Sequence, residues 1–169
     1  RNHRSGKSLQ STESHETIHG GYRLSKPNQP DAAHFVRVQL TRKSKELGAD
    51  FELLLTRYGL ERLLYRLSQS KYVNQFILKG ASMFLVWKGQ NFRVTKDVDL
   101  LGFGDAVVPK AEFIDFPSIL DFPQAHIRGY SHYTLAAEKI EAMVKLGIAN
   151  SRMKDFYDLC LLSRMFEFE

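Results

Sequence analysis

Apolar residues recur at helical spacing in the first half of the chain, beginning at Ala32. A period of three to four residues places one face of a helix on a core. The pattern predicts a first helix that ends near Gly48 and a second helix that Asp50 caps. We expect Gly59 to interrupt the second helix, and a third helix to continue from there to residues 68–70. These three short helices form a predicted N-terminal helical layer.

Short apolar runs bounded by turn residues follow in the middle of the chain. Residues 76–78 predict a short buried strand that leads into a turn at Gly80, and a helix over 82–87 opens at that turn. Alternation over 97–101 predicts a second strand. Residues 105–128 carry three prolines and no clean period, so we expect mostly loop there.

The last third of the chain is helical again. Thr134 is predicted to cap a helix that stops near Gly147, and Asn150 or Ser151 to cap the final helix. Short strands between two groups of helices are typical of an α+β fold. The predicted inner faces consist of Leu135, Ile140, Met143, Val144 and Leu146 in one helix and Phe156, Leu159, Leu162 and Phe166 in the other.

Residues 1–31 differ in composition from the rest. They are rich in Ser, Asn, His, Gly and Lys, and almost no periodic apolar pattern is present. Such segments bury too little apolar surface to offset the entropy cost of folding. We therefore expect residues 1–31 to be a flexible leader or the result of a wrongly placed start, and residues 32–169 to form a single domain.

Composition limits the class of protein. A hydrophobic content of 43% in 169 residues is enough for a folded core. The single cysteine, Cys160, excludes an internal disulfide and a multi-thiolate zinc site, and its apolar neighbours predict a small buried filler. No apolar run approaches the roughly 20 residues that span a bilayer. The sequence thus predicts a soluble, cytoplasmic protein without a membrane partner.

Charge is unevenly distributed along the chain. Residues 33–96 hold 12 Lys and Arg against 4 Asp and Glu, whereas residues 97–169 hold 7 against 12. A basic half beside an acidic half suits a protein that binds an anionic polymer and gathers metal-binding carboxylates elsewhere. Solvated helix faces explain the same distribution, so charge alone does not decide between them.

Two motifs in the middle of the chain can carry chemistry. The turn at Gly80 and Ser82 follows a strand, and its backbone N–H groups and hydroxyl can bind phosphate oxygens. Asp97 and Asp99 stand one residue apart, so on a strand their carboxylates point to the same side and can share Mg²⁺. The structural alternatives are an ordinary strand-to-helix turn with a capping serine, and surface aspartates beside a basic strand end.

Two further candidates lie in the predicted C-terminal helices. Lys139 is next to an apolar helix face, where its ammonium can reach triphosphate oxygens or simply extend a solvated head from a buried stem. Asp155 can orient Lys139 or a nucleotide base. Both Asp155 and Asp158 also suit the positive end of a helix dipole, which is the structural alternative.

Taken in order, the segments LKGAS, KDVDLLGFGD, AEKIEAMVKLG and SRMKDFYDLCLLSR resemble the AbiEii/AbiGii-type nucleotidyltransferases. These proteins are the toxin halves of bacterial toxin–antitoxin and abortive-infection systems. The resemblance covers residues 32–164. It implies a small mixed β-sheet flanked by helices, and the transfer of a nucleoside monophosphate from an NTP to RNA, in several members the 3′ end of tRNA.

Through this resemblance each candidate receives a role. Gly80 and Ser82 would bind phosphates, Asp97 and Asp99 would hold Mg²⁺, Lys139 would contact the triphosphate and Asp155 would be another essential acid. The implied partners are an NTP, an RNA acceptor expected to be tRNA, and a cognate antitoxin.

One departure from the family pattern is large. Similar proteins have several dozen residues between the DxD strand and the Pro-rich stretch, including a strand with a third carboxylate and a segment like VDIGFGDAV. In this chain residues 99–107 resemble both ends of that block joined together, which implies an internal deletion with Asp105 as the candidate substitute acid. The sequence therefore predicts either an active, shortened toxin domain or an inactive remnant that binds RNA or its antitoxin. A DNA-binding regulator is a third alternative, which no recognition-helix signature supports.

Overall fold

The computed structural model describes residues 31–89, 96–102, 107–147 and 150–168. Two helices begin this part of the chain. Helix α1 spans Ala32–Leu47 and helix α2 spans Phe51–Ser68. Asp50 caps α2, as predicted, by accepting a hydrogen bond of 3.0 Å from the backbone N–H of Leu53. The predicted leader, apart from Asp31, lies outside the described residues and stays a prediction.

Gly59 does not interrupt α2, so the prediction of separate second and third helices was wrong. A glycine inside a helix costs about 1 kcal/mol relative to alanine. Leu54 and Leu64, on either side of Gly59, are both almost fully buried, each in its own core cluster. Packing along one continuous face therefore outweighs the local cost of the glycine.

Within the described ranges, four short strands form one mixed sheet with the order β2-β1-β4-β3. Strand β1 (Phe76–Lys79) pairs antiparallel with β2 (Asp99–Gly102) and parallel with β4 (Ala125–Gly129). Strand β3 (Glu112–Phe116) pairs antiparallel with β4. Strands β2 and β3 are consequently the two edges of the sheet.

The prediction that residues 105–128 are mostly loop was wrong, because β3 and most of β4 lie there. The prolines at 109, 117 and 123 stand outside these strands and bound them. Within β3 the last residue, Phe116, is buried, and in β4 Ala125 and Ile127 are buried at alternate positions. Tertiary pairing thus stabilises two strands whose own sequences have little periodicity.

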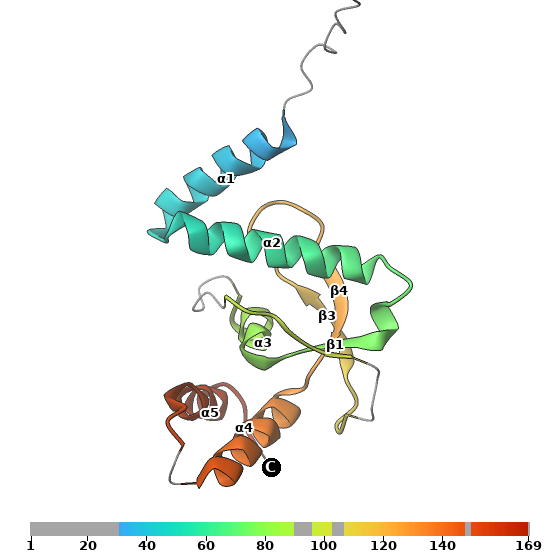
Figure 1. The fold of residues 1–169 in the computed structure, drawn as a ribbon, viewed down its shortest axis with the longest axis vertical. Helices are drawn as coiled ribbons and strands as arrows, with labels where there is room; N and C mark the ends of the chain where they lie inside the picture. The colour runs from blue at the N-terminus through green and yellow to red at the C-terminus, as the bar shows by residue number, and fades with distance from the viewer. Residues whose placement is uncertain (1–30, 90–95, 103–106, 148–149, 169) are drawn as a thin grey trace, which may run out of the picture. The chain divides into compact units, whose positions relative to one another are not determined.

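The core gathers around the sheet. Helix α2 lies on one side of β1, β3 and β4 in Figure 1, and helices α4 (His132–Leu146) and α5 (Met153–Met165) lie together on the other. Helix α3 (Met83–Lys88) follows β1 through the short 3-10 turn Gly80–Ser82. The predicted α+β class, with a mixed sheet, N-terminal helices and two C-terminal helices, is confirmed. Within the described residues no helix is long and apolar enough to cross a membrane.

The C-terminal helices differ from the prediction at their caps. Ser131, not Thr134, caps α4, and its hydroxyl accepts a hydrogen bond of 3.1 Å from the N–H of Thr134. Gly147 ends α4, as predicted. Arg152 precedes α5 without a side-chain cap, although Asn150 Oδ1 accepts a bond of 2.9 Å from its backbone N–H.

The predicted inner face of α4 was also wrong beyond the first turn. Leu135 is fully buried, but Ile140 is 52% exposed and Val144 is 76% exposed. Cys160, predicted to be a buried filler, is exposed on α5. Only the beginning of α4 therefore packs into the core, and its later turns depend on other contacts to hold their place.

A buried ion pair lies within α2, and its acid also binds the loop after β3. Arg57 Nε lies 2.8 Å from Glu61 Oε1, and each side chain is at most 3% exposed. The other oxygen, Glu61 Oε2, accepts a hydrogen bond of 2.9 Å from the backbone N–H of Ile119. Burial raises the pKa of Glu61 above its ordinary value, and the bonds from Ile119 and Arg57 oppose this shift only in part.

Replacing Glu61 by alanine should lower the free energy of unfolding by about 3 kcal/mol, because it leaves buried donors of Arg57 and Ile119 without their acceptor. Urea unfolding followed by circular dichroism measures this change. The exposed Glu52 of the same helix gives the control: Glu52→Ala should cost less than about 1 kcal/mol. Equal losses in the two variants would contradict the role of the buried pair.

Glu61 should also give the stability a defined pH dependence. Since its folded-state pKa is raised, its contribution to stability is fully present below the ordinary value of 4.5 and is lost as the pH rises through the raised value. Relative to Glu61→Gln, the wild-type protein should become more stable as the pH falls from 7 towards 4.5. Urea midpoints of both proteins across this range measure the difference, and a constant difference would refute the prediction.

Candidate active site

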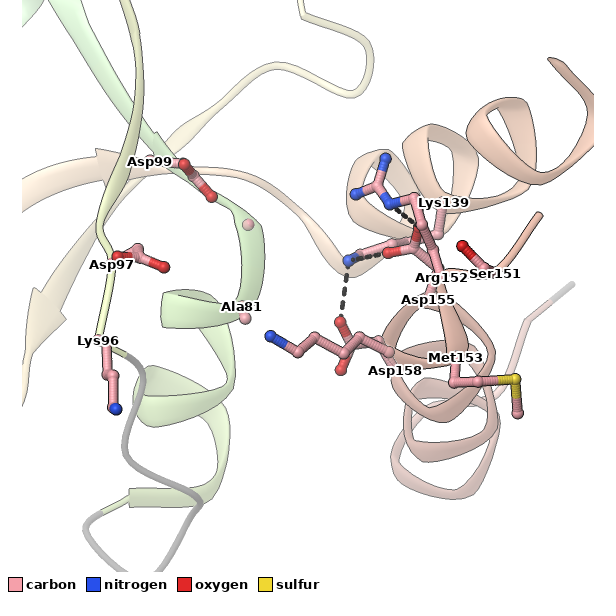
Figure 2. Close-up of a pocket in the computed structure, with 12 residues that line it drawn as sticks. Ala81, Lys96, Asp97, Asp99, Lys139, Ser151, Arg152, Met153, Asp155 and Asp158 are labelled. Carbon is pink, nitrogen blue, oxygen red and sulfur yellow. Dashed lines mark hydrogen bonds and ion pairs between the residues drawn. The ribbon is translucent and has the colours of Figure 1, made fainter. Parts of the chain in front are cut away.

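A pocket of about 830 Å³ opens between the β1–α3 turn and the C-terminal helices. Figure 2 shows Asp97 and Asp99 on one side of it and Lys139, Asp155 and Asp158 on the other. Most of the residues predicted for the site therefore face one cavity, although they come from four separate segments of the chain. The residues that line the pocket are Gly80, Ala81, Lys96, Asp97, Asp99, Lys139, Ser151, Arg152, Met153, Lys154, Asp155 and Asp158.

Gly80 and Asp99 are in direct contact. Strand pairing places Lys79 opposite Asp99, so the Asp99 carboxylate lies beside the next residue of the turn. Gly80 has a φ of +72°, and a Cβ added to it would lie 2.3 Å from Asp99 Oδ2. Both the backbone conformation and the close approach therefore require glycine here.

Asp97 lies just before strand β2 rather than within the predicted strand 97–101. Its carboxylate nevertheless lines the same pocket as that of Asp99, and both residues are exposed. Among the described residues, no lysine, arginine or histidine forms an ion pair with either carboxylate. Lys96 lines the same pocket, but within the described part of the chain neither acid forms an ion pair, so both carboxylates are available for an external cation.

The donor set of this pair fits Mg²⁺ in part. Magnesium is commonly held by one or two carboxylates, with waters and substrate phosphates completing its octahedron. Within the described residues no group of three His, Cys, Asp or Glu side chains gathers to hold a metal. Asp97 and Asp99 could supply two ligands to one ion, and Asp105, the predicted substitute acid, lies outside the described residues.

Ser82 is not among the residues that line the pocket. Its side chain is buried, and its hydroxyl donates a hydrogen bond of 2.9 Å to the backbone carbonyl of Lys79. This bond closes the turn on itself. A role of the hydroxyl in phosphate binding stays a prediction, and it would require the hydroxyl to leave this partner.

The opposite wall is built around Lys139. Its ammonium lies 2.7 Å from Asp155 Oδ1 and 2.9 Å from Asp158 Oδ2, and both acids are about 1% exposed. Burial alone would lower the pKa of Lys139, but the bonds to Asp155 and Asp158 outweigh it and raise the pKa. Lys139 therefore stays charged, and two buried contacts fix the position of its ammonium.

Arg152 is a member of the site that the sequence reasoning did not select. Its Nε lies 3.0 Å from Asp155 Oδ2, so two cations, Lys139 and Arg152, balance the two buried acids. Asp158, whose role the sequence left open, is the second partner of Lys139. The i,i+3 spacing of Arg152 and Asp155 at a helix start was the available signal.

Comparison with known proteins identifies the family of the chain. The family model described as nucleotidyl transferase AbiEii toxin, type IV toxin–antitoxin system, matches residues 62–106 and 101–169. The two matched segments overlap at residues 101–106, within the stretch where the sequence implied a junction. Neither the curated proteins nor the solved structures gave a match. Because residues 62–169 are well over half of the chain, this protein belongs to the AbiEii nucleotidyl transferase toxin family of type IV toxin–antitoxin systems.

Proposed function

We propose that this domain transfers a nucleoside monophosphate from an NTP to an RNA acceptor, with tRNA as the expected acceptor and Mg²⁺ as the cofactor. The observation that supports this most strongly is the placement of Asp97 and Asp99 across one pocket from Lys139. Asp97 and Asp99 would hold the metal. When bound, Mg²⁺ would neutralise phosphate charge and stabilise the charge that develops during transfer.

The charge of the pocket supports a polyphosphate substrate. Its lining contains four acids, at 97, 99, 155 and 158, and four cations, at 96, 139, 152 and 154, so the wall is close to neutral. A divalent cation on the exposed acids would make the pocket positive. A pocket that is positive only with metal would bind a metal–NTP complex in preference to a free anion.

Lys139 is suited to contact phosphate oxygens. An ammonium has three N–H donors, and Asp155 and Asp158 use two of them. The remaining donor is available to a ligand in the pocket. Because both acids are buried, the ammonium would not need to reorganise when an NTP binds.

The Gly80 turn would hold the phosphates from the other side. Gly80 and Ala81 line the pocket, and the backbone N–H groups of the turn would bind phosphate oxygens there. The same turn carries the contact to Asp99, which would bring the metal and the phosphates to one place. These contacts give substrate positioning, which is the main protein contribution in phosphoryl and nucleotidyl transfer.

A second candidate function follows from the small number of metal-binding acids among the described residues. The family match falls into two segments that overlap at residues 101–106, and among the described residues Asp97 and Asp99 are the only exposed acids that line the pocket. A two-metal mechanism uses a larger donor set than this pair. The alternative is therefore a catalytically inactive form that still binds RNA or the antitoxin that its family implies.

Asp97→Ala and Asp99→Ala should each abolish transfer, with a loss of about 100-fold or more, because each removes a ligand of the metal. The assay incubates the purified chain with tRNA, MgCl₂ and each of the four labelled NTPs, and counts label in the RNA. EDTA should have the same effect as the substitutions. Asp115→Asn, which changes an exposed acid outside the pocket, is the control and should retain activity.

The two candidate functions predict different outcomes in this assay. A wild-type chain that folds by circular dichroism but labels no RNA with any NTP would contradict the enzymatic proposal. Retained tRNA binding in that case, measured by filter binding at low and high salt, would favour the inactive form. Equal labelling by wild type and Asp97→Ala would contradict the assignment of the metal site.

A further inference from the structure

A second set of polar contacts lies beside the pocket and was not assigned a role above. Lys79 Nζ lies 2.6 Å from Glu138 Oε1, and the Tyr130 hydroxyl donates a bond of 3.1 Å to the same oxygen. Lys79 Nζ also lies 5.5 Å from the centroid of the Tyr130 ring. We call these three residues the Lys79–Glu138–Tyr130 cluster.

The cluster joins the two walls of the pocket. Lys79 directly precedes Gly80 and is the strand partner of Asp99, so it belongs to the wall that carries the DxD acids. Glu138 directly precedes Lys139 on α4, so it belongs to the opposite wall. The ion pair thus connects the immediate neighbours of two residues that are proposed to contact the same substrate.

Helix α4 needs such a connection. Its first turn is buried at Thr134, Leu135 and Ala136, whereas Ile140 and Val144 are exposed. Among the residues that the structure describes, Glu138 is the position farthest along α4 whose side chain hydrogen-bonds a residue of a strand. Lys139 is the next residue, and its own bonds run to α5 rather than to the sheet.

We infer that Lys79 and Glu138 are positioning residues, which hold α4 at a fixed distance from the β1–β2 wall and so place Lys139 opposite Asp99. This inference rests on the proposed function of the pocket. Neither residue is assigned to touch the substrate. Tyr130 supports the pair, because its hydroxyl donates to the Glu138 oxygen that Lys79 also contacts.

Burial sets the expected size of the effect. The side chains of Lys79 and Glu138 are 28% and 35% exposed, so solvent screens the pair in part. A pair of this exposure shifts an equilibrium by about fivefold. The Tyr130 hydroxyl, with a pKa raised to about 12 by burial and by the Glu138 charge, stays protonated and keeps donating across the neutral range.

A distance measurement tests the positioning directly. Nitroxide labels are attached at Val144→Cys on α4 and Gln69→Cys after α2, in a Cys160→Ser background. Electron paramagnetic resonance then gives the distribution of distances between α4 and the helix that packs on the sheet. Lys79→Met and Glu138→Gln should each broaden this distribution or shift its mean.

Glu141→Gln is the matched control. It breaks the Glu141–Lys145 pair, which has the same length of 2.6 Å but lies within α4. The distribution should not change in this variant. An unchanged distribution in Lys79→Met and Glu138→Gln, or an equal change in Glu141→Gln, would overturn the inference.

Activity provides the second test. Each of Lys79→Met and Glu138→Gln should lower the rate of nucleotide transfer by about fivefold, and the double variant should be no slower than either single one, because one interaction is lost in all three. Losses that multiply would show independent roles and overturn the inference. Tyr130→Phe removes only a hydroxyl and should give a smaller loss of transfer rate. This variant keeps the inference testable if a charge variant does not fold.

The two tests separate this inference from the proposed function. If wild-type protein transfers no nucleotide but the distance distributions change as expected, the proposed function fails and the positioning role stands. If transfer is present but neither distances nor rates respond to the substitutions at 79 and 138, the positioning role fails alone.

Discussion

The approach of the Asp99 carboxylate to Gly80 is the contact on which the rest of the site depends. Antiparallel pairing of β1 and β2 puts the acid beside the turn, and the absence of a side chain at Gly80 leaves room for it. Three features of the site therefore depend on one another: the register of β1 and β2, the left-handed backbone at Gly80 and the location of the Asp99 carboxylate. A larger residue at position 80 would displace either the carboxylate or the strand that carries it.

The acids on the two walls of the pocket differ in burial and in charge compensation. Asp155 and Asp158 are buried, and Lys139 and Arg152 compensate them. Such compensation is required, because a buried carboxylate without a cation is strongly unfavourable. Asp97 and Asp99 are exposed and have no cationic partner among the described residues. One pair of acids therefore orients protein groups, and the other pair remains available for a ligand.

Structural features that depend on neighbouring residues were predicted from the sequence better than features that depend on long-range contacts. The Asp50 cap, the strand before Gly80 and the end of α4 at Gly147 depend on neighbouring residues, and all three are confirmed. The continuity of α2 through Gly59 and the pairing of β3 with β4 depend on distant partners, which no local pattern encodes. The acids and the Gly80 turn were visible as local motifs, and the i,i+3 spacing of Arg152 and Asp155 was a local signal that was not used, whereas the Lys79–Glu138 pair, 59 residues apart, has no local signal.

The place of β2 at the edge of the sheet has a practical consequence. An exposed edge invites another strand to add to it, and proteins resist this with short edges and charged side chains. Strand β2 has only four residues, and Asp99 is one of them. Neutralising Asp99 would remove a charge from β2, which is an outermost strand among the described residues, whereas Asp97 lies before the strand. A variant without one of the two proposed metal ligands, for crystallisation or for co-purification with an antitoxin, is better made at Asp97.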